Sequence, residues 1–212
     1  MEDILSLLDS LGIKRAAVLG YSMGGRVALR LGLAAPDRVS ALVLESASPG
    51  IEDAAARKER RQSDAALAQM IEREGIEAFV DRWEKLPLFA TQNGLDTARR
   101  EALRAQRLAN NPGGLANSLR GMGAGQQEPV FDRLGELRMP VLLVAGELDA
   151  NYRKLARRMA KSIPNTRLEV VPGTGHTVHL EQPERFADLV NEFLQQLLPA
   201  DRLETPAWAF HD

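Results

Sequence analysis

The feature that most constrains the fold is a serine framed by glycines between an apolar strand and a helix. Residues 15–28 have the sequence RAAVLGYSMGGRVA, in which a short apolar run precedes the Gly-x-Ser-x-Gly turn and helical apolar spacing follows it. This pattern is a nucleophile elbow, in which small residues two before and two after the serine let strand and helix approach. We expect Ser22 to be a nucleophile or base, with the Met23 N–H as an oxyanion donor at the helix start.

Three more apolar runs of strand length follow the elbow and alternate with helical patterns. Strands followed by helices that lead to further strands form parallel units, so the sequence predicts an α/β fold with a mostly parallel sheet flanked by helices. The predicted strands are 16–19, 39–45, the run starting at 140 and 166–171, and the predicted core helices are 3–11, 26–33, 154–163 and 184–198.

The composition changes between the second and third strands. Charged helical segments at 54–74, 76–86 and 96–109 follow one another without a convincing strand, which indicates a helical cap inserted into the α/β core. Glycines 113, 114, 121, 123 and 125 are interpreted as cap loops, because no strand-to-helix phosphate context accompanies them. The expected organisation is a core at 1–48, a cap at 49–125, a second core part at 126–198 and a tail at 199–212, poorly ordered unless Trp208 or Phe210 docks.

Composition and charge exclude several functional classes. A net charge of −2 argues against a general nucleic-acid surface, and no apolar run approaches the roughly 18 to 20 residues of a membrane span. The acidic start lacks the basic region of a signal peptide, and the chain has no cysteine for disulfides or thiolate metal sites. We expect a cytoplasmic protein that binds neither nucleic acid nor membrane and needs no cofactor.

Three polar residues follow predicted strands in the order Ser22, Asp149, His176. Ligands of a parallel open sheet gather beyond the carboxyl ends of its strands, so these side chains are expected to meet there. A hydroxyl needs a base to take its proton, and the base needs an acid that fixes its tautomer. His176, in the glycine-rich turn after the last strand, fits the base, and Asp149 fits the acid.

Two neighbours compete for these roles. Glu147 lies two residues before Asp149, but it sits at the end of the strand, whereas the acid is expected on the following loop. His179 either packs at a helix start or lines the pocket, and packing is the favoured interpretation. The third histidine, His211, lies in the tail.

Residues 12–198 resemble the α/β-hydrolase fold through GYSMGGRVA, VAGELD and GHTVHLEQPERF. Within that superfamily the chain is most similar to the 2-succinyl-6-hydroxy-2,4-cyclohexadiene-1-carboxylate synthases of menaquinone biosynthesis. The particular likeness rests on the arginine of GYSMGGR, on ESASPGIED after the second strand, and on RKERRQSD and FVDRWEKLPLF in the cap.

The resemblance implies a carbon–oxygen lyase that removes a proton beside a succinyl ketone and expels pyruvate, with the triad serine as base. Its substrate is a small anionic polycarboxylate, which planar arginine forks recognise two hydrogen bonds at a time. By resemblance, Arg26, Arg60, Trp83 and Tyr21 are the binding residues. Taken singly, three of them have an alternative structural role. Arg60 would lie on a solvated helix face with Arg57 and Arg61, and Trp83 and Tyr21 would be packing residues.

One departure from the family concerns the sheet before the elbow. Family members have several strands there, including the loop that supplies the second oxyanion donor. Here only one helix precedes the elbow, so the elbow strand is expected to be an exposed apolar edge that could pair with a second copy as a homodimer. Two alternative functions stay open: a carboxylic-ester hydrolase or thioesterase on the same triad, and a truncated, non-catalytic module.

Overall fold

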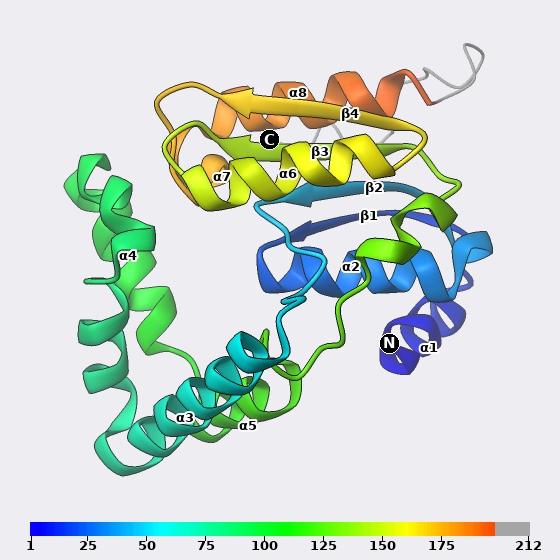
Figure 1. Cartoon of the computed structure of the whole chain (residues 1–212). Helices are drawn as coiled ribbons and strands as arrows, with labels where there is room; N and C mark the ends of the chain where they lie inside the picture. Colours follow the sequence, from blue (N-terminus) through cyan, green and yellow to red (C-terminus); the bar gives the residue numbers. More distant parts are fainter. Residues whose placement is uncertain (198–212) are drawn as a thin grey trace.

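Four parallel strands form one sheet in the order β1-β2-β3-β4. In this computed structural model, which describes residues 1–197, the strands are β1 (Ala16–Tyr21), β2 (Val39–Glu45), β3 (Val141–Gly146) and β4 (Thr166–Val171). All four arrowheads point to the same end of the sheet (Figure 1). The predicted parallel α/β fold is confirmed.

Helices cover both faces of the sheet, and β2 shows why. Its side chains alternate between the two faces: Leu42 and Leu44 belong to one buried cluster, and Ala41 and Val43 to the other. The first face packs against α1, α2 and α6, and the second against α7 and α8. These helices are α1 (Glu2–Ser10), α2 (Met23–Ala34), α6 (Ala150–Ser162), α7 (Val178–Glu181) and α8 (Pro183–Gln195).

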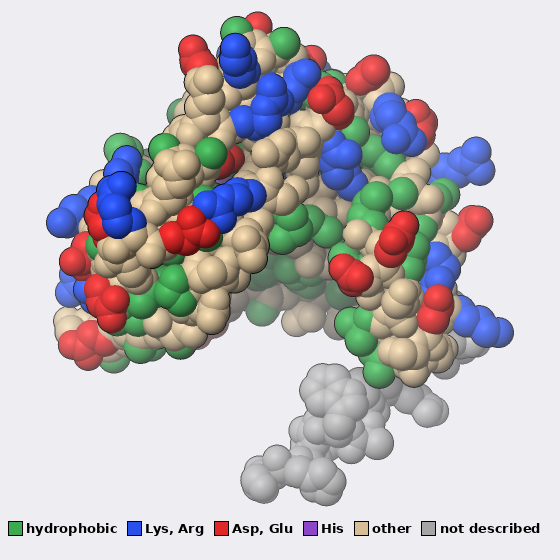
Figure 2. All heavy atoms as spheres, turned by 90° about the horizontal axis from the view of Figure 1, so that it is seen from below, with side chains coloured by type: hydrophobic (Ala, Val, Ile, Leu, Met, Phe, Trp, Pro, Cys, Tyr) green, Lys and Arg blue, Asp and Glu red, His purple; other side chains and the backbone are tan. Residues whose placement is uncertain are grey.

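The strand that carries the elbow lies at the edge of the sheet. Within residues 1–197 no strand pairs with the outer side of β1, and Leu19 is 50% exposed. Figure 2 shows the molecule from this side, with hydrophobic side chains gathered in a hollow between lobes that carry charged side chains. An apolar edge with open backbone groups is a surface that can pair with another strand.

The segment between β2 and β3 forms the helical layer that the sequence predicts beside the core. It lies off the carboxyl ends of the strands (Figure 1). A glycine at position 75 with φ of +87° divides the long first helix, which matches the predicted break between 74 and 76. The elements are α3 (Ala54–Trp83), the 3-10 helix η2 (Pro87–Gly94), α4 (Thr97–Leu108) and α5 (Pro112–Met122).

The interpretation of residues 113, 114 and 121 as loop glycines is wrong, because all three lie in α5. Asn111 caps this helix through its side-chain oxygen, which accepts the Gly114 N–H at 2.8 Å, and Pro112 occupies the first turn. Packing of α5 against α3 outweighs the low helix propensity of its glycines.

Smaller differences concern element ends. Helices α2 and α6 begin three and four residues before the predicted starts at 26 and 154. The elbow at Ser22 begins α2 and the Asp149 cap begins α6, so apolar periodicity marks neither start. The sequence also missed α7 and two short 3-10 helices, η1 (Pro36–Arg38) and η3 (Phe131–Glu136). None of the helices in the described part is long and apolar enough to cross a membrane. The tail at 199–212 lies outside the described residues.

Candidate active site

The turn at Ser22 has the geometry of a nucleophile elbow. Ser22 has φ of 48° and ψ of −105°, an unfavourable conformation for a residue with a side chain, and α2 begins at the next residue. Gly20 is required here, because a Cβ on it would lie 2.4 Å from the Gly24 carbonyl oxygen. Gly24 itself faces open space, so only the first glycine of the motif is needed for close approach.

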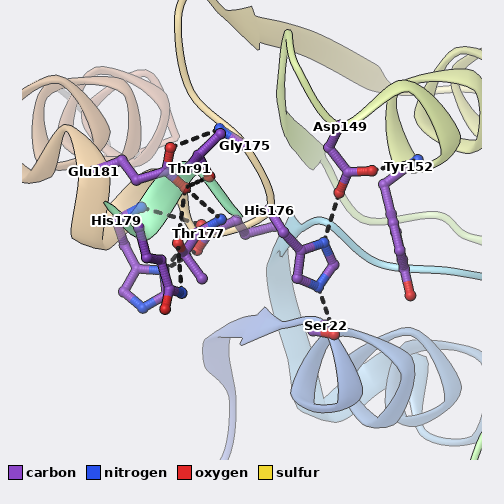
Figure 3. A network of polar contacts seen from close by, with 11 residues as sticks. Ser22, Thr91, Asp149, Tyr152, Gly175, His176, Thr177, His179 and Glu181 are labelled. Atoms are coloured by element: carbon purple, nitrogen blue, oxygen red, sulfur yellow. Dashed lines mark hydrogen bonds and ion pairs between the residues drawn. The ribbon is translucent and has the colours of Figure 1, made fainter. Parts of the chain in front are cut away.

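The structure brings Ser22, His176 and Asp149 into one hydrogen-bonded line (Figure 3). Ser22 Oγ lies 3.0 Å from His176 Nε2, and His176 Nδ1 lies 2.6 Å from Asp149 Oδ2. The imidazole is 1% exposed. Because the carboxylate accepts from Nδ1, Nε2 is left as the acceptor for the serine hydroxyl proton.

Each member of this line follows a different strand, as parallel-sheet geometry requires. Ser22 follows β1, Asp149 follows β3 and His176 follows β4. Asp149 also caps α6, because its Oδ1 accepts the Tyr152 N–H at 3.2 Å. One carboxylate therefore starts a helix and orients the imidazole, which fixes its position relative to the sheet.

The competing residues lie elsewhere. Glu147 is exposed, and its Oε2 accepts the Gly173 N–H at 3.0 Å. His179 belongs to α7 and pairs through Nδ1 with the buried Glu45 carboxylate at 2.8 and 2.9 Å. His179 lines the pocket and also packs at the start of a helix, so both interpretations offered for it describe part of its position.

A cavity of about 700 Å³ opens beside Ser22, between the sheet and the inserted helices. Arg26 reaches it from α2 in the core and Arg60 from α3 in the inserted segment. Apolar side chains supply much of the remaining wall: Phe79, Trp83, Leu88, Phe89, Leu103, Leu115, Leu119 and Leu180. The cavity therefore combines an apolar wall with cationic groups next to the serine.

Arg26 is a half-buried cation with unused hydrogen-bonding capacity. Its Nη2 donates to the Met122 carbonyl oxygen at 2.9 Å, but its Nε is buried without a partner among the described residues. Burial lowers the pKa of Arg26, and the nearby Arg60 lowers it further. A bound anion would supply the missing acceptor and offset the cost of burying this charge.

Arg60 is held differently from its neighbours Arg57 and Arg61. Its Nε donates to Asp64 Oδ1 at 2.8 Å, and the side chain is 46% exposed toward the cavity. Arg57 donates to the carbonyl oxygens of Ile51 and Glu52, and Arg61 donates to that of Gly125. Only Arg60 of the three lines the cavity, which separates it from the solvated-face alternative.

Aromatic rings surround the imidazole and the cavity. Trp83 packs against Phe79 and Phe89 with ring centroids 5.2 and 5.4 Å apart, so it is both a packing residue and part of the cavity wall. Tyr21 lies between the two histidines, 5.3 Å from the His176 ring and 4.9 Å from that of His179. Burial, followed by the Glu45 charge, raises the pKa of Tyr21, so its phenol stays neutral.

Two polar residues of the cavity, Arg107 and Tyr152, escaped the sequence analysis. Arg107 donates to Gln92 Oε1 at 2.7 Å and to Glu84 at 3.0 Å, and its guanidinium lies 5.6 Å from the Phe89 ring centre. It is one of several arginines on α4, and no sequence signal distinguishes it. Tyr152 stands 4.5 Å from the His176 ring, and burial raises its pKa. Its only sequence signal is its place three residues after Asp149.

No cluster of three potential metal ligands occurs within the part of the chain that the structure describes.

Comparison with known proteins agrees with this fold. Residues 1–183 match the family model of the alpha/beta hydrolase fold, and the chain belongs to that family. Over 197 residues it is 45% identical to a putative 2-succinyl-6-hydroxy-2,4-cyclohexadiene-1-carboxylate synthase of Bacillus subtilis, covering 93% of this chain and 72% of the relative.

Two further proteins are similar to this chain over most of its length. The corresponding synthase of Klebsiella pneumoniae is 33% identical over 178 residues, which are 84% of this chain and 68% of that protein. The solved structure of MenH from S. aureus superposes with a TM-score of 0.88 at 41% identity, covering 91% of this chain and 72% of the other. The family resemblance stated from the sequence is confirmed.

Proposed function

We propose that this chain is a pyruvate-eliminating lyase of menaquinone biosynthesis, acting on 2-succinyl-5-enolpyruvyl-6-hydroxy-3-cyclohexene-1-carboxylate. The observation that carries the proposal is that Ser22, which is hydrogen-bonded to His176, lines one cavity together with Arg26, Arg60 and Arg107. Its relatives named as synthases support the same reaction. We place the enzyme in the cytoplasm, because a chain without cysteine forms no disulfide and is compatible with that reducing compartment.

The proposed step is an elimination that starts at the ring carbon bearing the succinyl group. Ser22 Oγ takes the proton from this carbon and passes its own proton to His176 Nε2. The electron pair of the broken C–H bond forms a new ring double bond, the existing double bond shifts by one position, and the bond to the enolpyruvyl oxygen breaks. The released enolpyruvate takes up a proton and becomes pyruvate, leaving a cyclohexadiene.

The charges of the cavity suit this substrate. It carries several carboxylates, and each can accept two parallel N–H bonds from a guanidinium group. Arg26, whose buried Nε has no partner within residues 1–197, lies close to the serine on α2. Arg60 and Arg107 lie on the inserted helices. We assign Trp83 and Tyr21 to the walls that hold the ring between these cations.

The Met23 N–H is the proposed donor to the succinyl ketone oxygen. Met23 is the first residue of α2, so its N–H has no acceptor within the helix and carries part of the positive end of the helix dipole. Proton removal beside the ketone places negative charge on that oxygen. A donor already aimed there stabilises the enolate more than the ketone.

An ester hydrolase or thioesterase is the second candidate, because the apolar wall of the cavity would accept a neutral acyl group. Pyruvate release from the enolpyruvyl substrate, measured beside hydrolysis of a simple aryl ester, separates the two. We expect pyruvate release to be the faster reaction by orders of magnitude. Ester hydrolysis alone would establish the hydrolase, and no turnover of either substrate would leave a non-catalytic module.

A further inference from the structure

One carboxylate holds the backbone on both sides of His176. Glu181, the last residue of α7, accepts the Gly175 N–H at 2.7 Å through Oε2. Its Oε1 accepts the Thr177 N–H at 3.2 Å and the Thr177 hydroxyl at 2.8 Å. Figure 3 shows these bonds gathered at the loop that carries His176. The loop that carries the base is therefore fixed immediately before and immediately after it.

The same carboxylate also reaches the inserted helices. Thr91, in η2, donates its hydroxyl to Glu181 Oε1 at 3.0 Å. The Thr91 side chain is so close to the histidine loop that a Cβ on Gly175 would lie 2.2 Å from Thr91 Oγ1. Segments about 90 residues apart in the sequence are thus joined at one point, which Figure 3 shows with Thr91 beside Gly175.

A second path runs in parallel from the histidine loop to a cavity arginine. The buried Gln92 donates through Nε2 to Thr177 Oγ1 at 3.1 Å, and its Oε1 accepts from Arg107 at 2.7 Å. Thr177 Oγ1 in turn donates to Glu181. The hydrogen bonds form an unbroken line from a cationic group of the cavity to the carboxylate that holds His176.

Proton transfer requires the His176 imidazole to stay at a fixed distance from Ser22 and Asp149, and the Glu181 hydrogen bonds restrain the loop that carries it. A carboxylate that accepts several hydrogen bonds makes them shorter and roughly twice as strong as bonds between neutral groups. Displacement of a reacting group by about 1 Å costs about a hundredfold in rate. His176 must satisfy Ser22 and Asp149 at once, so a rigid loop has a direct catalytic benefit.

We propose that Glu181 is a positioning residue, which holds His176 in register with Ser22 and Asp149 and joins the histidine loop to the cavity-lining helices through Thr91. The proposal rests on the proposed function only for the choice of substrate. The positioning of His176 and the connection to the inserted helices can be tested separately, because Thr91 is the inserted-segment residue that donates directly to the Glu181 carboxylate.

The test compares three variants in steady-state pyruvate release. Glu181→Gln keeps the size of the side chain but puts an NH₂ group where an oxygen accepted donors, so kcat should fall about tenfold to a hundredfold with KM within a few-fold. Thr91→Val removes the direct hydrogen bond from η2 to Glu181 and leaves the Gln92–Thr177 bond in place, so it should raise KM several-fold with kcat nearly unchanged. Glu184→Gln, an exposed position on α8, is the matched control and should resemble the wild type.

A readout that needs no substrate accompanies the kinetics. The His176 Nδ1 proton, bonded to Asp149, should give a strongly downfield proton NMR signal in the wild type, which Glu181→Gln should shift or broaden while circular dichroism stays unchanged. Wild-type kcat in Glu181→Gln, or an unchanged signal with only a lower melting temperature, would overturn the proposal. Absence of pyruvate release by the wild type would count against the proposed function instead, and the signal would still decide the role of Glu181.

Discussion

Ser22 and His176 share one hydrogen bond, and neither can move the proton without the other. We therefore expect Ser22→Ala and His176→Ala each to lower kcat for pyruvate release by roughly 10⁴-fold to 10⁶-fold, and the double variant to be little worse. Steady-state kinetics of the three proteins on the same substrate measures this. Losses that add in free energy would show that the two side chains act independently.

The acid can be tested in the same assay with a matched pair. Asp149→Asn should lower kcat by about 10⁴-fold, because an amide no longer fixes the imidazole tautomer. Glu147→Gln makes the same chemical change at an exposed position whose side chain accepts the Gly173 N–H, and it should stay close to wild type. The reverse ranking would move the acid role to Glu147.

Arg26 and Arg60 should matter for anionic substrates and little for neutral ones. Removing one partner of a desolvated charge pair costs about 2 to 5 kcal/mol, which corresponds to about one to three orders of magnitude in kcat/KM. Arg26→Ala and Arg60→Ala should show this loss with the polycarboxylate and a far smaller one with a neutral aryl ester. Equal losses on both substrates would indicate a structural role.

Tyr152 gives the stability of the protein a pH dependence in the alkaline range. Burial raises its folded-state pKa above the ordinary value of 10.0, so the unfolded chain loses this proton first as the pH rises. The contribution is full below pH 10 and declines above it. Denaturant unfolding of Tyr152→Phe from pH 8 to 11 should show a flatter alkaline decline than the wild type.

The wild type and Tyr152→Phe differ only in the Tyr152 hydroxyl. Burial also shifts the pKa values of Tyr21 and Arg26, but both proteins contain these two residues. Parallel pH profiles of the two proteins would contradict this account of Tyr152.

At the scale of elements, the elbow turn tests whether close approach of strand and helix is essential. Gly20→Ala places a Cβ 2.4 Å from a backbone oxygen and should cost at least about 1 to 3 kcal/mol, or roughly 2 to 10 °C in melting temperature. Gly24→Ala makes the same change in open space and is the control. Equal melting temperatures for the two variants would show that the close contact at Gly20 does not limit stability.

The elements that could be predicted from the sequence are those whose signal is local. The strand at 39–45 is a β-branched apolar run beside a turn, and its observed bounds are identical. Helix α5 was missed because its stability comes from a cap at Asn111 and from packing on α3, neither of which is visible in a glycine-rich composition.

The same distinction applies to the candidate site. Ser22, Asp149 and His176 each follow a recognisable strand, so topology alone brings them to one edge of the sheet. Arg107 and Glu181 have no local signature. Their positions depend on where η2 and α4 rest against the histidine loop, and only the tertiary structure fixes that contact.

At the scale of the whole molecule, the outer side of β1 is an exposed apolar sheet edge. The strand sequence AAVLGY contains neither proline nor charge, the two devices that commonly block pairing at a sheet edge. Leu19 is half exposed, and the surrounding face is hollowed and lined with hydrophobic side chains (Figure 2). A second copy related by a twofold axis would place β1 against β1 and Leu19 near its counterpart.

We therefore expect the 212-residue chain to self-associate at micromolar concentration, as a dimer or a larger species in multi-angle light scattering. Leu19→Lys adds a charge at the pairing edge and should shift the population to monomer. Leu148→Lys changes an equally apolar, 59% exposed position on the loop after β3, two strands away, and should leave the association unchanged. A monomeric wild type, or dissociation by both substitutions alike, would rule out pairing through β1.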